Sequence, residues 1–133
     1  MRDYFCVDMP DGEIAGVSEL GLAYIGDAVF ELMVRSRLCT DGIVSARKMH
    51  AGAVERVSAR AQADAVRRVL PALTDLEAAV FKRGRNTRVN SPPRGAPQHE
   101  YHAATGLEAL FGFLYLKGER GRLCELFDII WET

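Results

Sequence analysis

The chain has 133 residues and a formal net charge of −1, with 17 basic and 18 acidic residues, a length that suits one domain and excludes two independent ones. No run approaches the roughly 18 apolar residues of a membrane span, and the amino terminus carries acids instead of the apolar core of a secretory signal. The three cysteines, Cys6, Cys39 and Cys124, are odd in number and far apart, which excludes a disulfide framework or cysteine zinc site, indicates a reducing cytoplasm and predicts buried thiols.

Residues 1–17 are predicted to be an irregular lead-in, with a turn at Pro10-Asp11-Gly12. Ser18 then has the residue type of an N-cap for a helix running to about Leu38. That segment is apolar on nearly all sides, so we expect it to be buried on nearly all sides.

Asp27 is the one charged residue between Leu20 and Phe30. An isolated charge in an apolar site is costly, so a buried aspartate needs a cation, a proton or a metal ion. The nearest basic residue on the same helical face is Arg35, and Glu31 forms the better i,i+4 pair with it. The local sequence therefore favours a metal-binding or catalytic role for Asp27, the alternative being a structural acid bonded to a neighbouring helix end.

Residues 45–70 repeat alanine, valine and charged residues with helical spacing, and Gly52 is expected to divide them into two segments. Pro71 closes this region. Thr74-Asp75-Leu76-Glu77 has the form of a capping box, which predicts a helix from there toward Arg85.

Residues 87–100 contain Pro92, Pro93, Gly95 and Pro97 and are predicted to form a long loop of the kind that often binds ligands. Residues 78–99 hold no acid, leaving 12 basic and 18 acidic residues elsewhere in the chain. This asymmetry favours a local phosphate-binding surface over an ordinary solvated face. Its basic members are Lys82, Arg83, Arg85, Arg88 and Arg94.

Two further helices are predicted, at about Tyr101 to Lys117 and Arg120 to Trp131. No alternating strand pattern is visible, so the fold class is all-α. Glu108 resembles Asp27 in being an acid within an apolar helix, and Gly26 and Gly112 flank the two acids where backbones could approach closely.

Two converging carboxylates repel each other unless one is protonated or a cation lies between them. With only oxygen ligands, magnesium or manganese fits best. His99 and His102 are an alternative metal pair, although the sequence shows no third ligand beside them.

Three segments now resemble one family. They are Leu22-Ala23-Tyr24-Ile25-Gly26-Asp27-Ala28-Val29-Phe30-Glu31, Lys82-Arg83-Gly84-Arg85-Asn86 and Glu108-Ala109-Leu110-Phe111-Gly112 followed by Tyr115-Leu116. In this order and spacing they resemble Mini-ribonuclease III, which is the ribonuclease III catalytic domain without its double-stranded-RNA-binding domain.

The resemblance implies the helical bundle of the ribonuclease III endonuclease domain. It also implies a homodimer that cleaves double-stranded RNA with Mg²⁺, one strand at each site, and that matures the ends of 23S ribosomal RNA precursor. Asp27 and Glu108 match the acids of the family's two motifs, and Asn86 joins the basic residues as an RNA contact. Ala23 and Thr105 stand where full-length ribonuclease III has two further acids, so the number of metal ions stays open, as does the need for a ribosomal protein.

Two rival functions are weighed against this one. An inactive ribonuclease III-like protein that only binds RNA or the ribosome would have no need of both buried acids. A metal-dependent phosphohydrolase of the HD type would need a His-Asp dipeptide, which this chain lacks.

Overall fold

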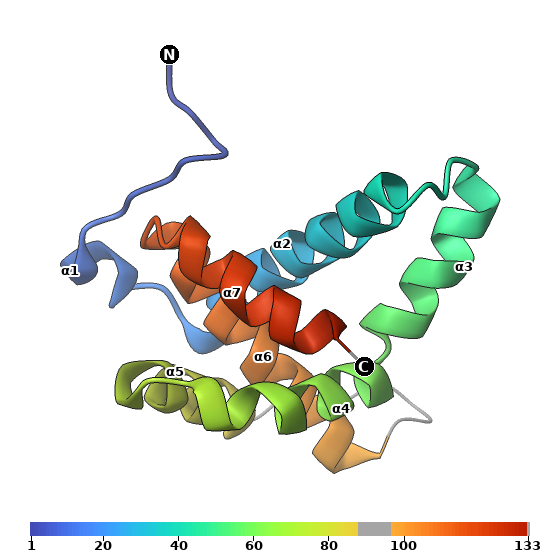
Figure 1. Ribbon diagram of the computed structural model, residues 1–133. Coiled ribbons are helices and arrows are strands. Elements are labelled where there is room, and N and C mark those ends of the chain that lie inside the picture. The colour runs from blue at the N-terminus through green and yellow to red at the C-terminus, as the bar shows by residue number, and fades with distance from the viewer. Residues whose placement is uncertain (88–96, 133) are drawn as a thin grey trace.

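The computed structural model describes residues 1–87 and 97–132, and within these residues the chain is all-α, as predicted, with no strand (Figure 1). No helix in this described part is long and apolar enough to cross a membrane. The elements, in chain order, are α1 (Asp11–Ile14), α2 (Glu19–Thr40), α3 (Ala46–Val57), α4 (Ala59–Val69), a 3₁₀ turn η1 (Leu70–Ala72), α5 (Asp75–Arg85), α6 (Gln98–Leu116) and α7 (Arg120–Trp131).

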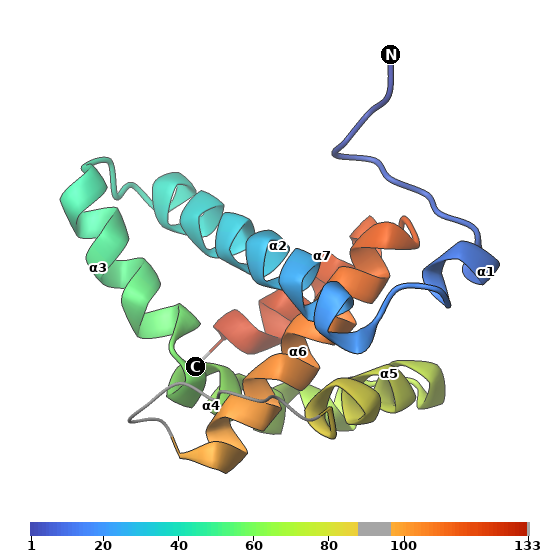
Figure 2. The same cartoon turned by 180° about the vertical axis from the view of Figure 1, so that it is seen from behind.

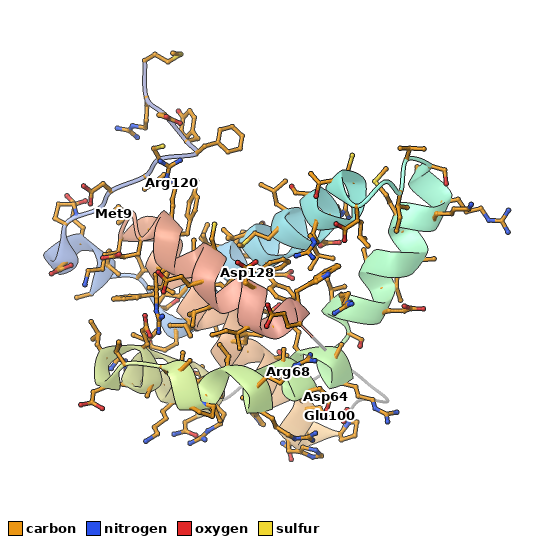
Figure 3. The ribbon with its side chains drawn as sticks, in the orientation of Figure 1. Met9, Asp64, Arg68, Glu100, Arg120 and Asp128 are labelled. Carbon is orange, nitrogen blue, oxygen red and sulfur yellow. The ribbon has the colours of Figure 1, made fainter. Side chains whose placement is uncertain are left out.

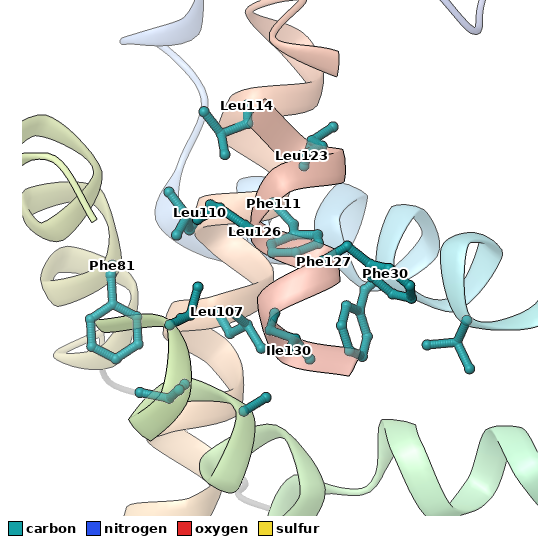
Figure 4. Packing of buried hydrophobic residues seen from close by; sticks show 14 of the residues in the cluster. Phe30, Phe81, Leu107, Leu110, Phe111, Leu114, Leu123, Leu126, Phe127 and Ile130 are labelled. Carbon is teal, nitrogen blue, oxygen red and sulfur yellow. The ribbon is translucent and has the colours of Figure 1, made fainter. Parts of the chain in front are cut away.

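Helix α6 runs through the middle of the fold, and α2, α4, α5 and α7 pack around it (Figures 1 and 2). The core forms where these helices meet, around a cluster of three phenylalanines (Figure 4). The Phe30 ring meets Phe111 edge-on at 5.4 Å between centroids and Phe127 at 6.0 Å. Edge-to-face aromatic pairs of this kind add to the hydrophobic stabilisation of a core, so α2, α6 and α7 are held together at this point.

Local signals placed several helix ends correctly. The Ser18 hydroxyl accepts a hydrogen bond from Gly21 N at 3.0 Å and so caps α2. At the start of α5, Glu77 N donates to Thr74 Oγ1 and Thr74 N donates to Glu77 Oε1, which confirms the predicted capping box. Helix α7 has the predicted bounds.

Three predicted boundaries were wrong. The break between α3 and α4 lies at Ser58, whose side chain caps α4, whereas Gly52 lies inside α3 and allows close approach to the Leu38 side chain. The lead-in contains the short helix α1. Helix α6 begins at Gln98, so the last residues assigned to the 87–100 loop are helical. Of the three helices concerned, α4 begins at a side-chain cap, whereas α1 and α6 begin after Pro10 and Pro97 without one.

The expected burial of α2 was also wrong. This helix packs mainly on α6 and α3 and also contacts α5, but Leu20, Tyr24 and Leu32 are 42%, 80% and 53% exposed. The three cysteines are exposed as well, contrary to expectation. An all-round apolar pattern requires burial, but it does not say whether the same chain or another one covers the helix.

Contacts between distant segments tie the periphery to the centre. Arg122 of α7 makes paired hydrogen bonds to the Glu77 carboxylate, Nε at 2.8 Å and Nη2 at 2.9 Å. Met9 N donates to Leu116 O at 2.7 Å, and Arg68 Nη1 donates to Glu132 O at 3.4 Å; Met9 and Arg68 are labelled in Figure 3. These bonds fasten the lead-in at Met9 and the end of α7 to the bundle.

Candidate metal and RNA-cleavage site

The two acids singled out in the sequence lie together where α2 crosses α6. Asp27 is on α2 and Glu108 is on α6, and their carboxyl groups lie within hydrogen-bonding reach of each other. They are 81 positions apart in the chain, so only the helix crossing brings them into contact.

Glycines set the closeness of this crossing. A Cβ atom added to Gly26 would lie 1.6 Å from the Glu108 backbone oxygen, and one added to Gly112 would lie 1.9 Å from the Leu22 oxygen. Any side chain at either position would force the helices apart. The prediction that Gly26 and Gly112 let the two backbones approach is therefore confirmed, and the same contact brings the acids together.

Burial of Glu108 and the neighbouring Asp27 carboxylate raise the pKa of Glu108 to about 8, burial being the larger cause. At neutral pH and without a cation, Glu108 thus keeps a proton that an exposed glutamate would have lost. A cation bound between the two acids would favour loss of that proton. In residues 1–87 and 97–132, no lysine or arginine forms an ion pair with either acid.

Asp27 is exposed, so the expectation that it is buried was wrong. It lies beside the more enclosed Glu108. The pair therefore combines one acid held within the packed helix crossing with one that is open to solvent.

Gln62, in the first turn of α4, is a site residue that sequence reasoning missed. Its side chain is only 3% exposed, and its amide lies beside the Glu108 carboxyl group. The usable signal was a glutamine on a helix face otherwise built from apolar residues, namely Ala63, Ala65, Val66 and Val69. Three helices, α2, α4 and α6, therefore contribute to the site.

The predicted RNA-contact residues lie at the end of α5 as far as the structure describes them. Lys82, Arg83, Arg85 and Asn86 are all exposed, and Arg83 forms a 3.3 Å ion pair with Glu19 at the start of α2. Gly84, among them, packs on Gly106 and Ala109 of α6, which joins this basic end to the helix that carries Glu108. Arg88 and Arg94 lie outside the described residues.

The alternative metal pair gains no further ligand. His99 is exposed and His102 is half-buried, with a buried Nδ1 atom that has no hydrogen-bond partner in the described chain. Across the ranges 1–87 and 97–132, no three histidine, cysteine or acidic side chains gather closely enough to hold a metal ion. The site at the helix crossing therefore offers two carboxylates, which is a donor set that suits a hard cation keeping several waters.

Comparison with known proteins decides the family. The family model "Ribonuclease III domain" matches residues 20–119. The chain is 46% identical to the Mini-ribonuclease 3 of Symbiobacterium thermophilum over 107 residues, covering 80% of this chain and 82% of that protein. It is 36% identical to the Mini-ribonuclease 3 of Clostridium tetani over 132 residues, covering 98% and 87%. The chain belongs to the Mini-ribonuclease III family.

A solved structure agrees with this assignment. A crystal structure of a protein from Fusobacterium nucleatum superposes with a TM-score of 0.79 at 27% identity and covers 87% of this chain and 94% of its own. The chain is therefore an endoribonuclease, a divalent-metal-dependent phosphodiester hydrolase of the ribonuclease III class that acts on double-stranded RNA.

Ala23 and Thr105 occupy the two positions at which full-length ribonuclease III has further acids, and both are packed inside the fold. Ala23 is buried against α6, and Thr105 is buried with its hydroxyl donating to Tyr101 O at 3.0 Å. Neither side chain supplies an anionic ligand, because a methyl group has no oxygen and the buried threonine hydroxyl is neutral. Asp27 and Glu108 are thus the two acidic side chains that the described residues bring to this site.

Proposed function

We propose that this chain cleaves double-stranded RNA with Mg²⁺ held by Asp27 and Glu108. The observation that carries the proposal is the contact of these two acids, with which no lysine or arginine of the described chain forms an ion pair. Burial, and after it the Asp27 carboxylate, raise the pKa of Glu108. Such a pair matches a hard divalent ion in ligand type and in charge. Mn²⁺ is expected to substitute, since it also takes oxygen ligands.

When bound, the ion supplies an activated water and polarises a phosphoryl oxygen, the chemistry of metal-assisted hydrolysis. The residues of this chain have complementary tasks. Asp27 and Glu108 hold the ion and set its position by the fixed helix crossing. The basic end of α5 holds the phosphate backbone so that the scissile bond lies at the acids.

The cleavage assay uses a short RNA duplex, the protein and Mg²⁺, beside the variants Asp27→Asn and Glu108→Gln. We expect both variants to lose cleavage while binding the duplex as the wild type does, because each substitution removes a metal ligand and leaves the basic surface intact. Cleavage by both variants at the wild-type rate would remove these residues from the mechanism. Absence of cleavage by the wild-type protein with Mg²⁺ or Mn²⁺ would contradict the proposed activity itself.

We further propose that Lys82, Arg83, Arg85 and Asn86, with Arg88 and Arg94 farther along the chain, contact the duplex. An A-form duplex is recognised through phosphates and 2′-hydroxyls, for which arginine and amide side chains are suited. Binding should weaken steeply as salt rises, because each neutralised phosphate releases counterions. A filter-binding titration that gave equal affinity at about 50 and 200 mM salt would contradict this surface.

The proposed active unit is a homodimer. Support comes from the apolar face of α2, where Leu20, Tyr24 and Leu32 are exposed beside Asp27, because exposed apolar side chains that follow one helix face are typical of an interface. Pairing two copies through this face would give two acid pairs, one for each RNA strand. We expect Tyr24→Arg to yield a folded monomer by light scattering coupled to gel filtration, with Tyr4→Arg, in the exposed lead-in, as the matched control.

As substrate we propose the 23S ribosomal RNA precursor, whose ends would be matured in the cytoplasm. The support is the membership in the Mini-ribonuclease III family, together with exposed free thiols that suit a reducing compartment. Incubation of a precursor transcript with the protein, with and without ribosomal proteins bound to the RNA, would test both the substrate and the need for assistance. Cuts at the mature ends are the expected result, and cuts scattered along unrelated duplexes at equal rates would contradict it.

A further inference from the structure

The side chain of Gln62 is the most enclosed polar group at the site. It belongs to the first turn of α4, after the capping residue Ser58, and only 3% of its surface is exposed. Glutamine is seldom buried to this extent unless its amide is fully hydrogen-bonded. A buried glutamine next to the proposed metal ligand Glu108 therefore calls for an account of each of its polar atoms.

The orientation of the amide is set by a backbone carbonyl. Nε2 of Gln62 donates to Val57 O at 3.1 Å, and because a carbonyl oxygen can only accept, the nitrogen of the amide must be the atom on that side. One N–H bond of Nε2 is used there. The second N–H remains for another acceptor, and the Glu108 carboxyl group lies beside this amide.

The other end of the amide has no partner. Oε1 of Gln62 is fully buried and accepts no hydrogen bond from any atom of the described chain. Such an atom in a native protein is explained by a water, an ion or a functional role. Here the neighbouring Glu108 carboxyl group belongs to the proposed site. Once that group is ionised to hold a cation it can no longer donate, so the donor for Oε1 is then to be sought in water held in the site.

We infer that Gln62 is a positioning residue for Glu108, whose carboxylate it holds through Nε2, while its free Oε1 accepts a hydrogen bond from water in the site. The inference rests on the proposed function, in which Glu108 is a metal ligand. Partners of this kind orient a ligand and raise its metal affinity, and their loss typically costs about 10- to 100-fold in metal affinity or activity.

The residue type fits this task better than the alternatives. A leucine would fill the same space without an orphaned oxygen, and a glutamate would add a third negative charge to two acids that already repel each other. Glutamine supplies one donor to the carboxylate and one neutral acceptor. Because Gln62 lies on α4, this helix supplies a polar group to the site in addition to packing against α6.

The test compares three proteins that share the same fold: wild type, Gln62→Leu and Gln62→Glu. Binding of Mn²⁺ and Mg²⁺ is measured by titration calorimetry on the RNA-free protein, and RNA cleavage is measured across a metal titration. For Gln62→Leu we expect metal binding weakened by about 10- to 100-fold, an unchanged KM for RNA, and a metal-free Tm that is equal or higher. The Tm is not expected to fall, because leucine gives up the hydrogen bond from Nε2 to Val57 O but also removes the buried Oε1, which no atom of the described chain satisfies.

Gln62→Glu separates a site role from a structural one. With a metal ion present, its carboxylate oxygen replaces Oε1 next to a positive charge, so we expect it to bind metal more tightly than Gln62→Leu. It should still bind metal more weakly than the wild type, because it too lacks the Nε2 donor to Glu108. A purely structural role gives the opposite order, since a buried extra acid is worse for packing than leucine. Thr105→Val is the matched control, being a buried polar-to-apolar change one turn before Glu108 whose hydroxyl serves only its own helix.

The outcomes for the two proposals are distinct. Wild-type cleavage together with unchanged metal binding and cleavage in Gln62→Leu would overturn the role of Gln62 and leave the proposed function standing. The role of Gln62 would likewise be overturned if Gln62→Glu bound metal more weakly than Gln62→Leu. Failure of the wild type to bind a divalent ion would instead contradict the proposed function.

Discussion

The Glu108→Gln substitution should stabilise the metal-free protein while abolishing its activity. In the fold, burial and the Asp27 carboxylate raise the pKa of Glu108 from 4.5 to about 8. Glutamine has nearly the same shape and no charge, so it removes the cost of ionising this position. The proposed site would thus sacrifice stability for metal binding, as functional sites commonly do.

The sign and size of the effect follow from proton linkage. A folded-state pKa above the unfolded value means that the folded protein holds the extra proton between about pH 4.5 and 8, so wild-type stability falls as pH rises through this window. At about 1.4 kcal/mol per pKa unit, the full loss above pH 8 is on the order of 5 kcal/mol and at pH 7 about 3 kcal/mol. Relaxation of the helix crossing and entry of water should reduce both figures by about half.

The assay is urea unfolding followed by circular dichroism, with a chelator present, from about pH 5 to 9. Because a dimer unfolds in a concentration-dependent way, protein concentration is held constant. The stability difference between Glu108→Gln and wild type should be small at pH 5 and grow by about 2 kcal/mol or more toward pH 9. Excess Mg²⁺ should stabilise only the wild type, and more strongly at about pH 8 than at pH 6, because the ligand must lose its proton to bind.

The control is Glu55→Gln, a change of the same chemistry at an exposed position of α3, which should leave the pH profile unaltered. A difference between Glu108→Gln and wild type that does not vary with pH would refute the assignment of a raised pKa to Glu108. Equal stabilisation of both proteins by Mg²⁺ would refute its role as a metal ligand.

Two further predictions concern the scaffold of the site. Gly26→Ala should lower the free energy of unfolding by about 3 kcal/mol or more, because its Cβ would collide with the Glu108 backbone oxygen, whereas Gly121→Ala, with open space around it, should leave the denaturation midpoint unchanged or slightly raised. Arg122→Met should cost about 3 kcal/mol at pH 7, because it leaves the buried Glu77 carboxylate unpaired. Since Arg122 lowers the pKa of Glu77, that loss should shrink as pH falls below about 4.5, and a loss independent of pH would contradict the pairing.

Much of the fold follows from interactions between residues near each other in the chain. Ser18 and the Thr74–Glu77 capping box act over three residues, so their helices begin where the sequence predicts. Gly26 and Gly112, near Asp27 and Glu108, also predicted a close helix crossing. Glycine destabilises a helix interior, and close approach of a second backbone is a reason for its presence there. For the same reason the two acids were recognisable as a pair from their apolar, glycine-flanked surroundings in the chain.

The sequence by itself determined the helical class, most helix ends and the two acids, because capping, helical period and the cost of a lone charge are properties of short segments. Only the tertiary structure decided which faces are covered, since that depends on what each helix meets. The tertiary structure leaves Asp27 and the apolar face of α2 exposed. It also places the break between α3 and α4 at Ser58 and brings Gln62 of α4 against Glu108. The surroundings of the Gln62 amide come from α3, α4 and α6, so no single stretch of the chain could predict them.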